Sequence, residues 1–338
     1  MRGLKKINKG PLTGKNRTYL DTYFQLMALN GSVRVLEVTR ELKILKPFKT
    51  GPKTAKEVSS VLKYSYKPIK IVLEALASLN LLEKKGELFV PSPVLSLLVG
   101  DYENLGNDYW DHLPELIKTG KPLLTIEKPK EIENQYAKQV KSLDWMMSPS
   151  AHEAVKLLRV GERRKNLKIL DVGAGSGVWS LAVVSRDPSS HTTLLDLKKI
   201  IDIAKKNVDD KKLRSQVSYI KGDFFKVNLP KKFNFVIVAN VLHIQSKRKN
   251  INLLKRLKKA LSPEGEILII DILPKDEEVR LPRLLYEIGL MLRTKDGQVY
   301  EQGEIISMLT KAGFSSVETI YIDQVPPYLM GMIMARPK

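Results

Sequence analysis

The sequence predicts an α/β protein, in which a parallel sheet flanked by helices follows a mainly helical N-terminal region. Between residues 170 and 271, short apolar runs alternate with helical patterns, and this alternation is typical of a doubly wound parallel sheet. Residues 54–82 have helical periodicity instead, and residues 83–90 read as a strand, a turn and a second strand. The chain is therefore expected to contain two differently built parts.

Composition narrows the possible classes of protein. The chain has 338 residues, 43% of them apolar, which is enough for two domains and a sizeable core. It has no cysteine, so disulfides, thiol nucleophiles and cysteine-ligated zinc are excluded, and its four histidines are scattered. We predict no metal site. The N-terminus lacks an apolar secretory block and no apolar run approaches the roughly 18 residues of a membrane helix, which predicts a cytoplasmic protein without a membrane partner.

The formal net charge of +20 raises the question of a nucleic-acid partner. Many lysines alternate with acidic residues, as they do in residues 83–85 and 275–277. This pattern is typical of a solvated surface. Charge alone therefore does not predict nucleic-acid binding.

A glycine-dense turn after a predicted strand is the most informative local pattern. Asp171 ends the apolar run, and Gly173, Gly175 and Gly177 follow at alternate positions. Glycine tolerates positive φ and has no Cβ, so the backbone can pass close to a small ligand before the next helix. Val178 stands where a dinucleotide-binding turn needs its third glycine, and no lysine follows as a phosphate loop requires.

The remaining pattern, D-x-G-x-G-x-G, resembles the cofactor loop of class I S-adenosylmethionine-dependent methyltransferases. The resemblance implies a Rossmann-like sheet of seven strands and S-adenosyl-L-methionine as cofactor. A second predicted strand ends in Asp196, whose carboxylate can accept both ribose hydroxyls. A third, over residues 217–225, contains Asp223 and Phe224, suited to the adenine amino group and ring. With these, the cofactor-binding residues implied are Asp171, Gly173, Gly175, Gly177, Asp196, Leu197, Asp223, Phe224 and Asn240.

The N-terminal part is interpreted as a winged helix. Thr54 and Glu57 form a capping-box pattern at the start of one helix, and residues 68–82 form the second. The second helix would read DNA in a helix-turn-helix protein, but it offers few side chains suited to base edges. Packing or dimerisation is therefore favoured. Its interior positions are expected to be Ile69, Ile71, Val72, Leu73, Leu76, Leu79, Leu81 and Leu82.

A winged helix followed by D-x-G-x-G-x-G resembles the small-molecule O-methyltransferases of the caffeic-acid and hydroxyindole types. The resemblance implies a dimerisation domain over residues 1–100, a helical linker contributing to the substrate pocket over 101–160, and a cofactor-binding catalytic domain over 161–338. It also implies a homodimer and a small acceptor with an aromatic hydroxyl.

Five residues are candidates for the acceptor pocket. Trp145, Met146 and Met147 match a segment of the family near cofactor and substrate, although such side chains also fill cores. Residues 282–294 are a predicted helix, on which Tyr286 and Met291 are candidates for the pocket wall.

His243 and Asp271 are the candidate catalytic residues. His243 follows the predicted fourth strand, residues 233–242, where parallel strands place ligands, and the resemblance implies a histidine base there. Asp271, at the end of the fifth strand, residues 266–271, matches a family carboxylate that partners the histidine. The chain departs from the family in having Ile244 and Gln245 after the histidine, and residues 297–300 lack a second glutamate. A histidine that only lies beside the cofactor is the alternative.

Two other functions remain open. An RNA or DNA methyltransferase would suit the basic run over residues 247–259 and the basic N-terminus. Pyrimidine C5 methylation needs a cysteine, and the usual Asn/Asp-Pro-Pro-aromatic motif of base-amino methylation does not follow the fourth strand. A non-catalytic, cofactor-sensing DNA-binding regulator is the third hypothesis. The basic N-terminal residues are Arg2, Lys5, Lys6, Lys9, Lys15 and Arg17.

Overall fold

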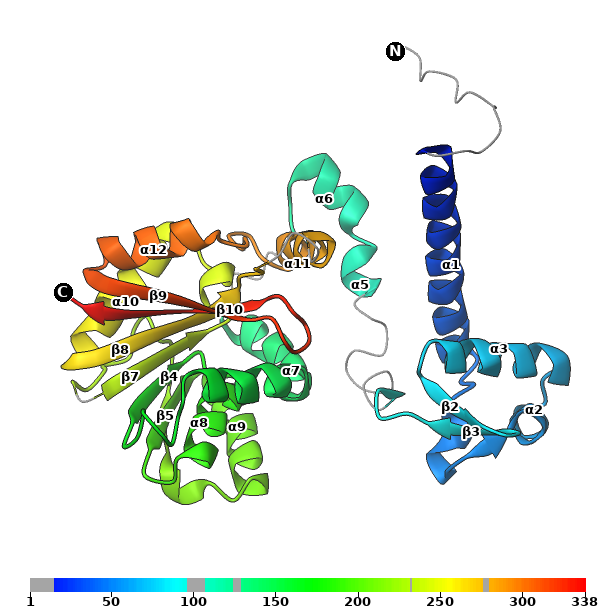
Figure 1. The fold of residues 1–338 in the computed structure, drawn as a ribbon, viewed down its shortest axis with the longest axis horizontal. Coiled ribbons are helices and arrows are strands. Elements are labelled where there is room, and N and C mark those ends of the chain that lie inside the picture. Colours follow the sequence, from blue (N-terminus) through cyan, green and yellow to red (C-terminus); the bar gives the residue numbers. More distant parts are fainter. Residues whose placement is uncertain (1–14, 96–106, 124–128, 232, 276–279) are drawn as a thin grey trace, which may run out of the picture. The chain divides into compact units, whose positions relative to one another are not determined.

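The computed structural model describes residues 15–95, 107–123, 129–231, 233–275 and 280–338. The chain forms two compact units, Met1–Leu105 and Gly106–Lys338 (Figure 1). Of the basic N-terminal residues, those before residue 15 lie outside the described residues, and no side chain is described before residue 19.

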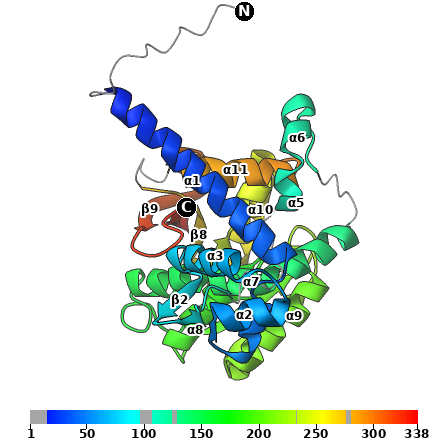
Figure 2. The same cartoon turned by 90° about the vertical axis from the view of Figure 1, so that its right-hand side faces the viewer.

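The first unit consists of helices around a small antiparallel sheet. The sheet has the strand order β1-β3-β2, and both views show α1 extending beyond the other helices of this unit (Figures 1 and 2). The predicted succession of two helices and a hairpin is present. Its elements are α1 (Lys15–Glu41), η1 (Lys46–Thr50), β1 (Lys53–Thr54), α2 (Ala55–Leu62), α3 (Tyr66–Ser78), β2 (Leu82–Lys85) and β3 (Leu88–Pro91).

Local sequence signals determine where these helices start and stop. Both hydrogen bonds of the predicted capping box between Thr54 and Glu57 are present at the start of α2. The second helix ends at Ser78, earlier than predicted, because Asn80 adopts a left-handed conformation with φ of 59°. Ile69, Leu73 and Leu76 form the buried side of α3, whereas Ile71 and Leu79 are exposed, contrary to expectation.

The second unit contains the predicted seven-stranded sheet, which confirms the fold class. The strand order is β6-β5-β4-β7-β8-β10-β9, with β10 antiparallel to both of its neighbours and all other pairs parallel. The strands are β4 (Lys168–Val172), β5 (His191–Asp196), β6 (Val217–Lys221), β7 (Phe233–Ala239), β8 (Leu261–Ile272), β9 (Phe314–Ile322) and β10 (Met330–Pro337).

Helices cover both faces of this sheet. Figure 1 shows α8 and α9 on one side and α10 and α12 on the other, and two apolar clusters lie under these two layers. Near-continuous apolar runs such as that of β7 are buried on both faces, as expected for parallel strands. The helical segments are α5 (Asn107–Trp110), α6 (Leu113–Thr119), α7 (Pro129–Leu157), α8 (Val178–Arg186), α9 (Lys198–Asp210), η2 (Arg214–Gln216), η3 (Leu242–Ile244), α10 (Lys247–Ala260), α11 (Arg280–Arg293) and α12 (Gln302–Lys311).

Three predicted strands have different bounds in the structure, and in two of them a local turn is the reason. The third strand stops at Lys221 because Gly222 turns the chain with φ of 147°. The fourth stops at Ala239, since Asn240 has φ of 57° and the helical turn η3 follows. The fifth is longer than predicted and begins at Leu261. Both turns bring polar residues to the carboxyl ends of the parallel strands.

No helix within the described parts of the chain combines the length and the apolar character needed to cross a membrane.

Candidate functional site

The glycine turn joins β4 to α8 in a conformation that requires glycine. Gly173, Gly175 and Gly177 all have positive φ, of 67°, 56° and 80°. A Cβ on Gly173 would lie 2.7 Å from Cγ2 of Val241, and one on Gly175 would lie 3.2 Å from the hydroxyl of Tyr136. The turn is therefore closely enclosed, and side chains at these positions would fill the space along its backbone.

Asp171 lies inside β4, beneath this turn, and is almost completely buried. Its Oδ2 accepts a hydrogen bond of 2.6 Å from the hydroxyl of Ser180, in the first turn of α8. Burial raises the pKa of Asp171 to about 7, and the Ser180 hydrogen bond opposes that rise. Near neutral pH this carboxyl therefore exchanges a proton in response to small changes in nearby charge.

Asp196 ends β5 and holds the turn through backbone hydrogen bonds. Its Oδ2 accepts from the N–H of Gly175 at 2.9 Å, and its Oδ1 accepts from the N–H of Leu197 at 2.7 Å. Burial raises the pKa of Asp196 to about 6, the two N–H groups lower it, and Glu133 raises it further. Each oxygen still has a second lone pair with which it can accept a hydroxyl.

The Asp223–Phe224 segment forms a compact turn after β6. Asp223 Oδ1 accepts from the N–H of Phe225 at 2.8 Å, and Arg256 of α10 donates through Nε to the carbonyl of Phe224 at 3.1 Å. Cε1 of Phe224 lies 3.7 Å from the position of a Cβ on Gly173. The structure thus brings together turns that follow three different strands.

Two buried polar atoms lie in the turns that follow β4 and β7. Among the described residues, Ser176 Oγ and Asn240 Oδ1 are buried without a hydrogen-bond partner. Such atoms are costly unless a ligand or water satisfies them. A ligand with hydroxyl or amino groups could satisfy them, as it could the free lone pairs of the Asp196 carboxylate.

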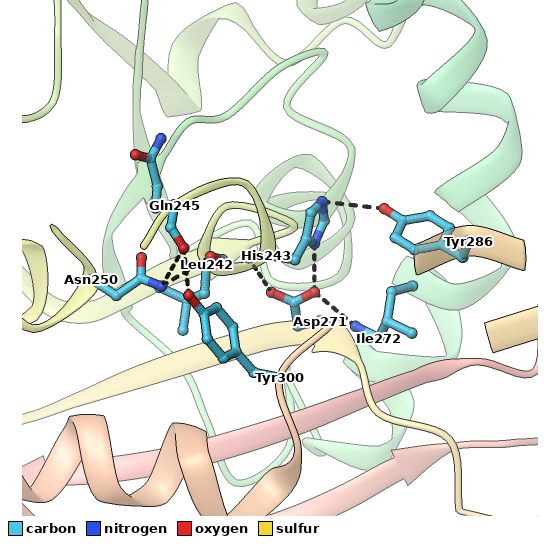
Figure 3. Close-up of polar contacts among 8 residues, drawn as sticks. All are labelled: Leu242, His243, Gln245, Asn250, Asp271, Ile272, Tyr286 and Tyr300. Carbon is cyan, nitrogen blue, oxygen red and sulfur yellow. Dashed lines mark hydrogen bonds and ion pairs between the residues drawn. The ribbon is translucent and has the colours of Figure 1, made fainter. Parts of the chain in front are cut away.

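His243 lies in η3, between β7 and α10. The side chains of Asn250 and Tyr300 hold the main chain on either side of it. Asn250 donates from Nδ2 to the carbonyls of Leu242 at 2.9 Å and Gln245 at 3.4 Å. The hydroxyl of Tyr300 also donates to the Gln245 carbonyl, at 2.5 Å (Figure 3). These bonds fix the turn that carries the imidazole.

His243 lies between a carboxylate and a phenol, as Figure 3 shows. Its Nδ1 lies 2.6 Å from Oδ1 of Asp271, and its Nε2 lies 3.2 Å from the hydroxyl of Tyr286. His243 and Asp271 are buried, with 4% and 3% of their surface exposed. Because the backbone N–H of His243 and of Ile272 also point at the Asp271 carboxylate, Asp271 acts as an acceptor. We therefore assign the proton of neutral His243 to Nδ1, which leaves Nε2 as an acceptor.

The other candidates for the acceptor site differ in their surroundings. Met147 is half-buried and packs, like Tyr286, against the apolar cluster under α8. Met146 is partly buried, whereas Trp145 and Met291 are 51% and 47% exposed. Tyr286 is thus the one of these five predicted residues for which the structure records a hydrogen bond with His243. Within the described residues, no group of three metal-ligating side chains is arranged to hold a metal ion.

Several residues that shape the site were missed by sequence reasoning. Ser180 had a usable signal, because it lies in the first turn of the helix that leaves the glycine turn. Arg256 and Tyr300 had none, since each reaches a turn distant in sequence. Asn250 bonds to the turn just before its own helix and was also missed. Glu133 of α7, which accepts from the N–H of Lys199 at 2.6 Å, likewise depends on how two distant helices pack.

Comparison with known families agrees with this geometry. The model of the O-methyltransferase domain family matches residues 118–315, more than half of the chain. The chain belongs to this family. The match includes the glycine turn, β5 to β8 and the His243–Asp271 pair.

Individual relatives have low sequence identity to this chain. Acetylserotonin O-methyltransferase of Bos taurus is 33% identical over 150 residues, covering 44% of this chain and 43% of that protein. The chain thus spans less than half the length of this curated relative. The tetracenomycin polyketide synthesis 8-O-methyl transferase of Streptomyces glaucescens is 26% identical over 273 residues, covering 73% of this chain and 77% of the relative.

The fold has close counterparts among solved structures. Human N-acetylserotonin methyltransferase, solved in complex with S-adenosylmethionine, has a TM-score of 0.73 at 22% identity, covering 97% of this chain and 99% of that one. A putative O-methyltransferase of Nostoc punctiforme also has a TM-score of 0.73, at 19% identity, covering 94% and 98%. These two likenesses concern the fold.

Proposed function

We propose that the protein is an S-adenosyl-L-methionine-dependent O-methyltransferase that acts on a small acceptor with an aromatic hydroxyl. The observation that carries the proposal is the Asp271–His243 pair beside the glycine turn, because it places a base near the predicted methyl donor. Membership of the O-methyltransferase domain family supports it.

The cofactor would be held by the three turns at the carboxyl ends of β4, β5 and β6. The backbone at Gly173 and Gly175 would approach it, Asp196 would accept the ribose hydroxyls, and Asp223 and Phe224 would contact the adenine. Asp171, Gly177, Leu197 and Asn240 complete the proposed set. When bound, the cofactor supplies an electrophilic methyl group on a sulfonium.

His243 would remove the proton of the acceptor hydroxyl. Its Nε2 is the acceptor nitrogen, and Asp271 at Nδ1 orients the ring and stabilises the imidazolium that forms. Removal of this proton makes the acceptor oxygen electron-rich as it aligns with the methyl carbon. Trp145, Met146, Met147, Tyr286 and Met291 are proposed to line the acceptor site.

The alternatives have weaker support. Part of the basic run on α10 forms ion pairs within the protein, with Lys247 bound to Glu304 and Lys249 to Asp296. Arg256 supports the Phe224 turn. Because these side chains already have partners within the protein, the structure favours a small acceptor over a nucleic acid. The cytoplasmic location stays a prediction.

We propose that residues 1–100 form a winged-helix dimerisation domain, followed by the linker and the catalytic domain as predicted. Large apolar side chains on α1 are exposed, among them Tyr23, Phe24 and Leu26, and a second copy would cover them. Changing Phe24 and Leu26 to serine should shift the protein from dimer to monomer in sedimentation experiments, whereas changing the exposed Leu281 should not. A monomeric unaltered protein would contradict the proposal.

The function is tested in two steps. Calorimetry should detect binding of S-adenosyl-L-methionine to the purified protein, and a screen of phenols and hydroxyindoles should detect conversion of the cofactor to S-adenosylhomocysteine. Absence of binding would refute the methyltransferase proposal. Binding together with turnover on RNA alone would support the nucleic-acid alternative.

Cofactor binding is expected to depend on pH through Asp196. The pKa of this acid is raised to about 6, so lowering the pH through that value neutralises it and removes the charge that the ribose hydroxyls contact. The dissociation constant should therefore rise as the pH falls from about 8 to about 5. Asp196→Asn should bind weakly and lose most of this dependence, although Asp171 titrates nearby. Asp202→Asn, an exposed control on α9, should behave like the unaltered protein.

A further inference from the structure

A tyrosine hydroxyl lies at the nitrogen of His243 that would take the acceptor proton. Tyr286 Oη is 3.2 Å from Nε2, and the two rings meet edge to face at 90° with their centroids 5.5 Å apart. Because Asp271 fixes the imidazole proton on Nδ1, the Tyr286 hydroxyl donates to Nε2. The site thus contains a chain of three groups, phenol, imidazole and carboxylate (Figure 3).

Tyr286 is held in this position by its surroundings. It lies on α11, is half-buried, and packs against the apolar cluster that also contains Trp179 and Leu290. Leu290, four residues further along α11, is buried and anchors the same side of the helix. These contacts hold the phenol beside His243.

We propose that Tyr286 is a further catalytic residue, whose hydroxyl carries the proton of the acceptor to His243; this inference rests on the proposed O-methylation. The acceptor oxygen gives its proton to Oη of Tyr286 as it bonds to the methyl carbon, and Tyr286 gives its own proton to Nε2. One O–H bond breaks and one forms at Tyr286, so its side chain is again a neutral phenol after the reaction. The positive charge of the sulfonium is replaced by that of the imidazolium, which Asp271 stabilises.

The chemistry of the two hydroxyls supports this path. A tyrosine and a phenolic acceptor carry the same functional group and have similar pKa values. Transfer of a proton between them therefore has a free-energy change close to zero. Direct transfer to His243 would instead require the acceptor to displace Tyr286 from Nε2. Transfer through Tyr286, which we call the relay, keeps the Tyr286–His243 hydrogen bond that the structure shows. Displacement of Tyr286 by the acceptor would break this bond.

The test compares Tyr286→Phe with the unaltered protein, because phenylalanine keeps the packing and removes the hydroxyl. With a phenol that is un-ionised at the assay pH, kcat should fall by about 100-fold, within the usual range for general acid–base catalysis. With a nitrophenol that is already ionised, kcat should change little, since no proton has to be moved. An equal loss with both acceptors would overturn the relay and make Tyr286 a packing residue.

Binding measurements distinguish the relay from displacement. In the presence of S-adenosylhomocysteine, which cannot react, calorimetry should find the same acceptor affinity for Tyr286→Phe as for the unaltered protein. Tighter binding with undiminished kcat would mean that Tyr286 blocks the base, and would overturn the proposal. Tyr321→Phe is the matched control, because its hydroxyl bonds to Gln302 on α12.

Failure of the inference differs from failure of the proposed function. If the unaltered protein methylates phenols and Tyr286→Phe does so at the same rate, the relay is wrong and the O-methyltransferase proposal stands. If the unaltered protein methylates no hydroxyl acceptor although it binds the cofactor, the proposed function itself fails.

Discussion

Replacing His243 by alanine is expected to lower the rate of methyl transfer to an un-ionised phenol by roughly 10²–10⁴-fold, because the acceptor proton loses its base. The dissociation constant for S-adenosyl-L-methionine should stay the same, since the side chain of His243 is not among the proposed cofactor contacts. Production of S-adenosylhomocysteine gives the rate, and calorimetry gives the affinity.

Two further variants separate chemistry from folding. His243 is buried and paired with Asp271. Alanine therefore leaves a cavity and removes the imidazole hydrogen bond from a buried carboxylate, so unfolding must be followed alongside. His243→Gln fills the space with an amide that can still donate to Asp271, and it should be equally inactive but more stable. His152→Ala, at an exposed position on α7, should retain full activity. Unchanged turnover in His243→Gln would mean that proximity alone drives the reaction.

Replacing Gly173 by alanine is expected to lower the free energy of unfolding by about 2–5 kcal/mol, the sum of left-handed strain and overpacking. The backbone has φ of 67° there, and the new Cβ would lie 2.7 Å from Cγ2 of the buried Val241. Cofactor affinity should fall as well, because the turn shifts. Chemical denaturation and calorimetry measure the two effects.

The same substitution at a permissive glycine provides the control. Gly303 lies in α12 without a positive φ, and a Cβ there would meet nothing within 4 Å. Gly303→Ala should therefore be neutral or slightly stabilising, by less than about 1 kcal/mol. If both variants lost the same stability, the conformation of the glycine turn would not be the cause.

Local patterns predicted much of the fold. Apolar runs and glycine spacing placed β4, β5, β7 and the start of α8, because these features depend on residues close in sequence. Ends of elements were less accurate. The fourth strand was extended three residues too far, since nothing in its apolar run indicated that Asn240 would take a left-handed conformation.

In the candidate site, too, some residues could be predicted from local patterns and others could not. Asp171, Asp196 and the three glycines could be named from their spacing. In the structure the glycines form one enclosed turn, Asp171 lies in the strand before it, and Asp196 accepts a hydrogen bond from its backbone. His243 and Asp271 could be paired in advance only through family resemblance. The structure adds the physical reason: β7 and β8 are parallel neighbours with Ala239 opposite Ile270, so the residues that follow them lie side by side.

The sequence by itself determined the succession of strands and helices along the chain, the glycine turn and the identity of the acids that end the strands. These follow from backbone preferences and from the alternation of apolar and polar residues. Only the tertiary structure decided that Tyr286 meets His243 across 43 positions of sequence and that Arg256 supports the Phe224 turn. Such contacts depend on strand order and helix packing, which no local pattern encodes.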